Sequence, residues 1–146
     1  MHKKLLVTAY FVIAALLQTL AGNFPLSFFA FPLNVIVAVI WIYSLWRLYK
    51  EGNKLPLTRF LLSSRTSVLS ILLLIGGSLV IGLFPQLSEA EADSMPGVLA
   101  SLGCYNFMTS WIFIAILFLL LSNLAMVIIH AFYHCVPAKK RFILNH

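Results

Sequence analysis

The sequence predicts an all-α integral membrane protein with four membrane-spanning helices and both termini in the cytoplasm. Of its 146 residues, 62% are apolar and only 10% are charged, whereas soluble domains are about half apolar and about a quarter charged. The apolar residues form four long runs, and the charged residues lie at the ends of these runs or between them. No stretch remains for a separate soluble domain, so residues 1–146 are expected to form one membrane domain.

The basic residues predict the orientation. All ten lie at alternate ends of the apolar runs: Lys3, Lys4, Arg47, Lys50, Lys54, Arg59, Arg65, Lys139, Lys140 and Arg141. Lysine and arginine favour the cytoplasmic side, and three of the four acids, Glu89, Glu91 and Asp93, fall in the loop expected outside. The net charge of +6 is therefore interpreted as a topology signal. The expected partner is the lipid bilayer and not a nucleic acid.

The first span is predicted at about residues 5–22. A basic start followed by an apolar run is also typical of a secretory signal peptide. The length of the run, the missing cleavage pattern and the second span close behind it favour a retained helix. The second span, at about residues 28–49, has Pro32 near its start, where a missing amide hydrogen is tolerated. Its inner end carries aromatic residues suited to the headgroup region, namely Trp41, Tyr43, Trp46 and Tyr49.

The third span is predicted at about residues 66–84, after a basic loop whose residues 57–64 lead in along the interface. Ser70 and Gly77 share a face on which a neighbouring helix can approach closely. Residues 86–109 form the predicted external loop, with a short turn near residues 98–102. The fourth span, at about residues 110–133, is expected to stop before Pro137 and the basic triplet.

No catalytic residues are predicted. The four acids lie outside the spans, and the sequence contains neither a P-loop nor a Gly-x-Ser-x-Gly motif. Cys104 and Cys135 are expected at opposite membrane faces, where they cannot form a disulfide, and neither has the spacing of a metal site. The chain is therefore not expected to be an enzyme or to hold a metal of its own.

His130 and His134 are candidate cofactor-binding residues. They are four residues apart on the last helix and share one face, which Asn123 and Met126 continue toward the membrane centre. Two axial ligands of one haem iron come from opposite porphyrin faces, so both histidines cannot ligate the same iron. The alternative is a pair of interfacial polar residues, because His130 lies roughly 28 Å along the helix from Trp111.

Two stretches of the sequence carry a resemblance to a known family. The first comprises residues 60–67 (FLLSSRTS) and the end of the following span, residues 82–86 (GLFPQ), and the second is residues 102–113 (LGCYNFMTSWIF). With residues 29–34 (FAFPLN), their order and their positions at membrane boundaries resemble the ResB (CcsB) family of cytochrome c biogenesis proteins. The resemblance covers roughly residues 28–146 and is greatest to the ResB-like branch of Bacteroidetes-type bacteria.

The resemblance implies haem delivery by the System II pathway in the bacterial cytoplasmic (inner) membrane. It implies a CcsA-type membrane protein as partner and apocytochrome c on the external side. In the family, a histidine that opens the next span is a candidate haem ligand, and residues 141–146 (RFILNH) match that context. A ligand role is therefore carried over to His146. Family members usually continue into another helix, which implies either a truncated or split product or a short form that depends on a partner chain.

The leading hypothesis is a non-catalytic membrane subunit of a cytochrome c haem-delivery complex. The alternative is a small multi-pass scaffold or accessory protein without a cofactor, which the absence of any intramembrane charge favours. A transporter or channel fits less well, because it would need polar pore-lining residues or paired broken helices.

Overall fold

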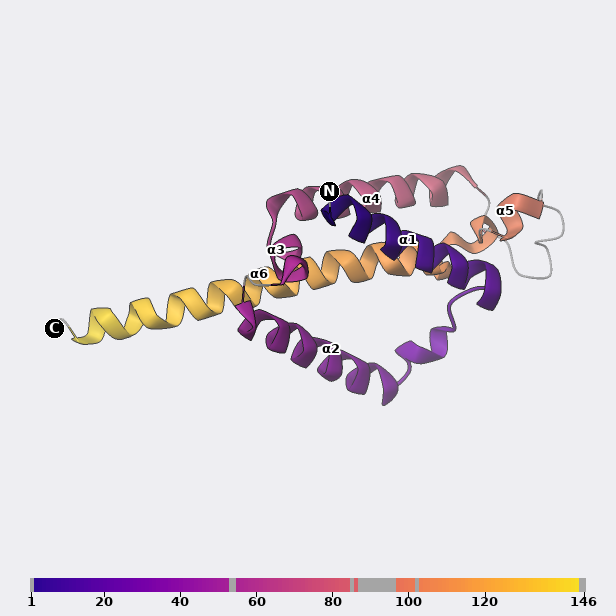
Figure 1. Ribbon diagram of the computed structural model, residues 1–146. Coiled ribbons are helices and arrows are strands. Elements are labelled where there is room, and N and C mark those ends of the chain that lie inside the picture. The colour runs from indigo at the N-terminus through magenta and orange to yellow at the C-terminus, as the bar shows by residue number, and fades with distance from the viewer. Residues whose placement is uncertain (1, 53–54, 85, 87–96, 102, 145–146) are drawn as a thin grey trace.

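The computed structural model describes residues 2–52, 55–84, 86, 97–101 and 103–144, and it is helical throughout its regular structure (Figure 1). No strand occurs in these ranges. In chain order the elements are α1 (His2–Ala21), η1 (Leu26–Phe29), α2 (Leu33–Lys50), α3 (Pro56–Leu61), α4 (Ser64–Leu83), α5 (Gly97–Ser101), η4 (Cys104–Thr109) and α6 (Trp111–Leu144). The prediction of an all-α fold is confirmed.

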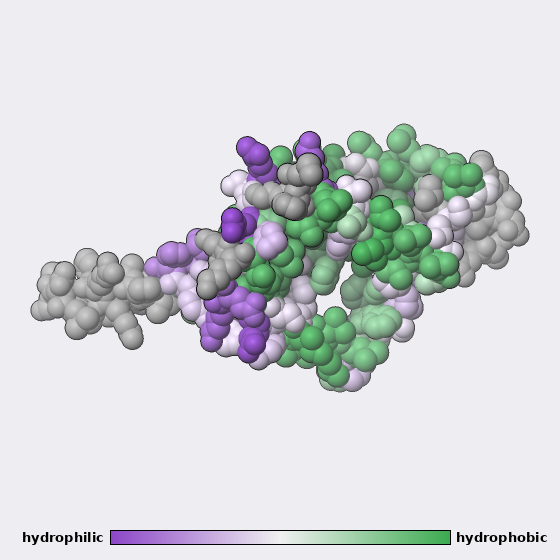
Figure 2. All heavy atoms as spheres, viewed as in Figure 1, coloured by the Kyte–Doolittle hydropathy of each residue, from purple (hydrophilic) through white to green (hydrophobic). Residues whose placement is uncertain are grey.

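Four of these helices, α1, α2, α4 and α6, are long and apolar enough to cross a membrane. Each has an apolar stretch of at least 18 residues, which corresponds to about 27 Å of helix, close to the hydrocarbon thickness of a bilayer. Figure 2 shows hydrophobic side chains covering much of the visible surface of the bundle. A soluble monomer rarely exposes so much contiguous apolar surface. The chain is a multi-pass membrane protein, as predicted.

Helix α6 is the central element of the bundle. It contacts α1, α2, α3 and α4, and Figure 1 shows it between α4 on one side and α2 on the other. Helix α2 meets the rest of the chain mainly at α6 and η1, and most of its side chains are exposed. Trp41 of α2 donates a hydrogen bond from Nε1 to Ser122 Oγ of α6 at 3.2 Å. Helix α6 therefore holds the other three spans together.

Helices α4 and α6 approach each other closely at small residues. Ser70 is fully buried, and a Cβ added to Gly77 would lie 3.1 Å from the ring of Phe113 on α6. Both residues lie on the contact face that the sequence predicted. Gly76 and Gly82 face open space, since a Cβ at either position would meet nothing within 4 Å.

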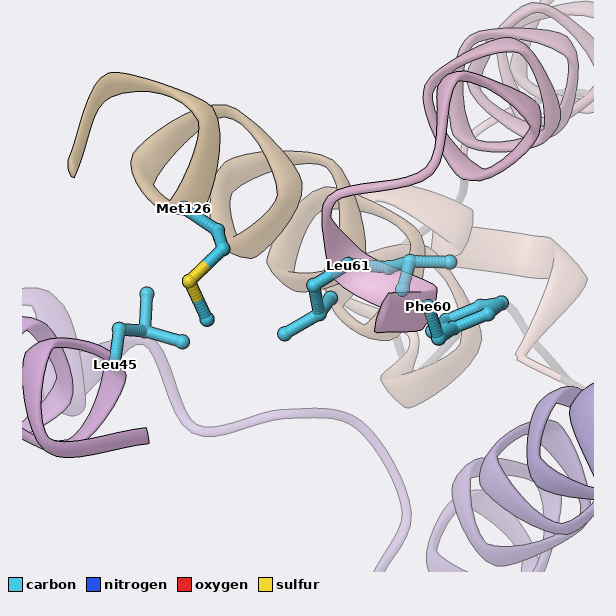
Figure 3. Packing of buried hydrophobic residues seen from close by; sticks show 5 residues of the cluster. Leu45, Phe60, Leu61 and Met126 are labelled. Atoms are coloured by element: carbon cyan, nitrogen blue, oxygen red, sulfur yellow. The ribbon is translucent and has the colours of Figure 1, made fainter. Parts of the chain in front are cut away.

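A small apolar core lies where α2, α3 and α6 meet (Figure 3). It consists of Leu45, Phe60, Leu61, Leu119 and Met126. Residues 57–64 were predicted to lead into the third span along the interface. The short helix α3 lies in this stretch, and its residues Phe60 and Leu61 are at most 8% exposed because they pack against the apolar surface of α6. The position of this stretch along the interface stays a prediction.

Two predicted helix boundaries are wrong. Helix α2 begins at Leu33, not near residue 28, because the short helix η1 and then Pro32 at the N-cap precede it. Helix α6 continues through Pro137, where the sequence predicted that it stops, to Leu144, while its candidate membrane span, Trp111–His134, agrees with the predicted span at about residues 110–133. A proline inside a helix removes one backbone hydrogen bond and clashes with the carbonyl four residues before it, which can kink a helix without ending it, and Figure 1 shows this part of α6 projecting beyond the other helices. The short turn expected near residues 98–102 is α5.

Candidate functional site

One end of the bundle gathers basic side chains, and we call it the basic end. It is defined by Arg47, Lys50, Arg59 and Arg65, which lie where α2 finishes and where α3 and α4 begin. Figure 2 shows hydrophilic side chains at this end and few elsewhere on the visible face. Helix α6 passes through the basic end and carries both candidate histidines there.

His130 and His134 share a face of α6, as predicted. Their ring centroids are 4.4 Å apart in an edge-on arrangement, and both side chains are exposed. The Tyr49 hydroxyl on α2 lies 3.1 Å from His130 Nδ1. Next to this contact, Trp46 Nε1 donates to the Tyr133 hydroxyl at 2.7 Å. The aromatic residues that the sequence placed in a headgroup belt therefore also fasten α2 to α6.

A pocket of about 860 Å³ opens beside the histidines, within the range of about 300–1,000 Å³ that is typical of small-molecule sites. Its polar lining comes from Arg59, His130, His134, Tyr49, Thr58, Ser64 and Ser67. Leu62, Val68 and Val127 provide apolar lining. No acidic side chain of the described residues lines the pocket. The described lining therefore combines polar and basic side chains with an apolar wall.

The two histidines do not fit a haem iron as a pair of axial ligands. They project from successive turns of one helix, so they would approach a porphyrin from the same side. The Nδ1 atom of His130 is occupied by Tyr49, and no described cysteine or methionine lines the pocket. Within the described ranges, no three His, Cys, Asp or Glu side chains gather as metal ligands. A haem at this end would need a ligand from elsewhere.

Asn123 and Met126 do not extend the histidine face as a polar stripe. Both are buried, at 1% and 0% exposure. Asn123 Nδ2 donates to the Leu61 carbonyl, and its Oδ1 accepts from Ser67 Oγ at 2.8 Å. Asn123 thus joins α6 to α3 and α4, and Met126 belongs to the apolar core. Their role is structural.

The opposite end of the bundle is joined by side-chain amides, and we call it the amide end. Gln18 of α1 is 3% exposed; its Oε1 accepts from the Trp111 backbone N–H at 2.8 Å, and its Nε2 donates to Asn23 Oδ1 at 3.0 Å. The sequence alone predicts no role for Gln18, a polar residue within the first apolar run. Such a residue is costly in lipid unless it is paired, and that cost is the signal that could have identified it.

A second glutamine completes the amide end. Gln86 Oε1 accepts from the Phe107 backbone N–H at 3.0 Å, and the Gln86 Nε2 donates to the Phe84 carbonyl at 3.0 Å. Gln86 belongs to the first stretch that resembles the ResB family, and Phe107 belongs to the second. The two stretches therefore touch.

No known protein family, curated protein or solved structure matches this chain. Functional inference therefore rests on the residues and contacts of the chain itself. Among these, the basic-end pocket offers binding chemistry, whereas the amide end offers helix joints.

The remaining candidate residues provide no chemical group at either place. Cys104 is buried in η4, and burial raises the pKa of its thiol, which keeps the thiol protonated and unreactive. A buried, protonated thiol of this kind packs as a small apolar side chain. The side chain of Cys135 and the whole of His146 lie outside the described residues, so the ligand role carried over to His146 stays a prediction.

Proposed function

We propose that this chain is a ResB-like membrane subunit of a complex that delivers haem to apocytochrome c, acting with a CcsA-type partner. The observation that carries the proposal is the contact between Gln86 and Phe107. These residues come from two stretches that resemble the ResB family, and they lie near the two ends of the predicted external loop, residues 86–109. A family pattern whose parts form one joint is less easily produced by chance than two isolated motifs.

The proposed role of the chain is to position a haem-handling partner. Helix α2 presents most of its surface away from the other helices, and a partner can pack on such a surface without displacing any contact within the chain. Haem is the cargo of the complex. His146 is the one residue of this chain proposed to ligate it, because His130 and His134 do not form an axial pair.

The proposed orientation places the basic end in the cytoplasm of a bacterial inner membrane. Four of the five basic residues between α2 and the start of α4 lie at this end, and basic residues are retained on the cytoplasmic side. The amide end and residues 86–109 would then face the apocytochrome.

A scaffold without a cofactor is the second candidate. The contact of His130 with Tyr49 and the contacts of Asn123 with Leu61 and Ser67 favour it. Each of these polar groups already has a partner within the chain, and each contact joins two helices.

Visible spectroscopy distinguishes the two candidates. The chain is co-expressed with a CcsA-type protein, purified through a tag on the chain and scanned for a haem Soret band. The proposal expects a Soret band that shifts or weakens in His146→Ala, with His130→Ala and His134→Ala as controls that leave it unchanged. A colourless complex, or a band that depends equally on all three histidines, would contradict the proposal.

A further inference from the structure

We propose that His130 and His134 together bind one late divalent transition-metal ion, such as Zn²⁺, Ni²⁺ or Cu²⁺, in the basic-end pocket. The proposal goes beyond haem delivery, for which His146 is the proposed ligand. The spacing of the cysteines predicts that the chain holds no metal of its own, and the geometry of the two histidines leads to a different conclusion.

The two histidines have the spacing of a metal-binding pair. Imidazoles four residues apart project from one face of a helix and can bind the same zinc ion, as they do in the His-Glu-x-x-His motif. Because a bond from zinc to an imidazole nitrogen is about 2.0–2.1 Å long, two imidazoles in neighbouring coordination positions have ring centroids about 4.5–5 Å apart. Those of His130 and His134 are 4.4 Å apart, and both side chains are exposed and can rotate. Ala131 stands where that motif has its glutamate, so the pair lacks the general base of a metalloprotease.

Tyr49 holds His130 in the orientation that a metal ligand needs. The Tyr49 hydroxyl lies 3.1 Å from His130 Nδ1. A histidine that binds a metal through one ring nitrogen donates its other N–H to an acceptor, which fixes the tautomer and the orientation of the ring. When Nδ1 carries the proton and donates it to the Tyr49 hydroxyl, the lone pair of Nε2 points to the metal. Tyr49 is therefore a positioning residue, and it comes from a different helix, α2.

The lining of the pocket favours a metal that binds nitrogen over a hard cation. No described acidic side chain lines the pocket, and Arg59 does. Ca²⁺ and Mg²⁺ require oxygen ligands, above all carboxylates, whereas neutral imidazole suits zinc, copper and nickel. Water molecules complete the coordination, and a pocket of about 860 Å³ leaves room for them.

Isothermal titration calorimetry of the full chain in detergent, purified through a tag without histidine, tests the site. Zn²⁺ is expected to bind at one ion per chain, and Mg²⁺ is not expected to displace it. His130→Gln and His134→Gln should each abolish measurable Zn²⁺ binding. His146→Ala is the control: it should leave Zn²⁺ binding unchanged, although the haem proposal expects it to alter the Soret band. The two proposals therefore fail separately.

Two further measurements separate a built site from adventitious binding. Tyr49→Phe should weaken Zn²⁺ binding about tenfold, the lower part of the range for a residue that orients a metal ligand. Tyr133→Phe is its matched control, since the Tyr133 hydroxyl also joins α6 to α2 but does so through Trp46. Cu²⁺ binds to nitrogen sites more tightly than Zn²⁺. Electron paramagnetic resonance of the Cu²⁺-loaded chain should show splitting from two nitrogens, and from one nitrogen in His134→Gln.

Several outcomes would overturn the proposal. Zn²⁺ binding that survives in His130→Gln or His134→Gln would place the metal elsewhere, and displacement by Mg²⁺ would indicate a site made of oxygen ligands. Equal losses in Tyr49→Phe and Tyr133→Phe would show that Tyr49 does not orient His130. Circular dichroism checks that each variant is folded, and loss of Zn²⁺ binding in folded His130→Gln and His134→Gln supports the proposal.

Discussion

The two ends of the bundle join their helices in similar ways but leave different surfaces. At the amide end, Gln18 and Gln86 accept hydrogen bonds from the backbone around the start of α6. At the basic end, Asn123 links α6 to α3 and α4, and an open pocket remains beside the joint. Side-chain amides therefore fix the fold at both ends, and at the basic end the charged residue Arg59 lines the pocket.

The comparison separates residues that hold the helices from residues that can bind a ligand. Substitutions in the joints, or in the contact between α4 and α6, should lower stability. Substitutions in the lining of the pocket should change binding and leave stability nearly unchanged. The following predictions test this separation, in decreasing order of expected effect.

The largest effect is expected at the contact between α4 and α6. Gly77→Leu should destabilise the protein by about 3 kcal/mol, the upper part of the range for overpacking, because a Cβ there already lies 3.1 Å from Phe113. Gly76→Leu is the control, since nothing lies within 4 Å of its Cβ. Thermal unfolding in detergent, followed by circular dichroism, measures both. Equal midpoints for the two variants would show that the helices do not pack at Gly77.

At the basic end, the hydrogen bonds of Asn123 are expected to contribute less to stability than the contact between α4 and α6. Asn123→Leu should cost about 2 kcal/mol, because it removes two hydrogen bonds and leaves the Leu61 carbonyl buried without its partner. Ser78→Ala is the control: the Ser78 hydroxyl is exposed and bonds only to the Leu74 carbonyl of its own helix. Unfolding by sodium dodecyl sulfate titration compares the stability of the two variants. If Asn123→Leu is as stable as the wild type, the hydrogen bonds of Asn123 do not stabilise the protein.

At the amide end, Gln86 is exposed, so its hydrogen bond should contribute still less to stability. Gln86→Leu is expected to cost about 1 kcal/mol, the usual net value of one hydrogen bond, since the Phe107 N–H loses its acceptor. Gln86→Glu retains an acceptor oxygen and should remain close to the wild type. If both variants lose the same stability in thermal unfolding, the contact with Phe107 is not the cause.

Cysteine labelling compares how easily a thiol reagent reaches the two ends of the bundle. The substitutions that it requires are expected to have the smallest effect on folding. In a Cys135→Ala background, Cys104 should react slowly with a membrane-permeant maleimide. Burial restricts access to this thiol and raises its pKa, so less thiolate is present at a given pH and the rate should rise as pH rises. With Cys104 also replaced, Ser64→Cys at the pocket should react faster, because Ser64 is exposed. Faster labelling of Cys104 than of Ser64→Cys would show that Cys104 is the more accessible of the two thiols and would contradict the prediction.

The four spans could be predicted because lipid imposes a strong constraint on sequence. A chain segment in hydrocarbon must be apolar and must form all its backbone hydrogen bonds internally, so each span can be recognised from its composition alone. The face shared by Ser70 and Gly77 was predictable for a related reason, since it depends only on helical periodicity. The boundaries at Leu33 and Leu144 were not predictable, because a proline does not settle where a helix begins or ends.

The joints and the pocket could not be predicted, because they depend on contacts between distant residues. Gln18 and Trp111 are 93 positions apart, and Tyr49 and His130 are 81 apart. The sequence correctly predicted the face shared by His130 and His134, because both lie on one helix. It did not indicate that Arg59 and Tyr49 would come to that face from two other helices.

Maturation of a reporter cytochrome c tests the proposed function most directly. A bacterial host that lacks its own cytochrome c biogenesis system expresses an exported apocytochrome c and a CcsA-type partner, with or without this chain. Haem-dependent peroxidase staining of the reporter after denaturing electrophoresis measures covalent attachment. The account predicts a stained reporter only when the chain and the partner are both present. Equal staining without the chain, while the partner is expressed at the same level, would contradict a role in haem delivery.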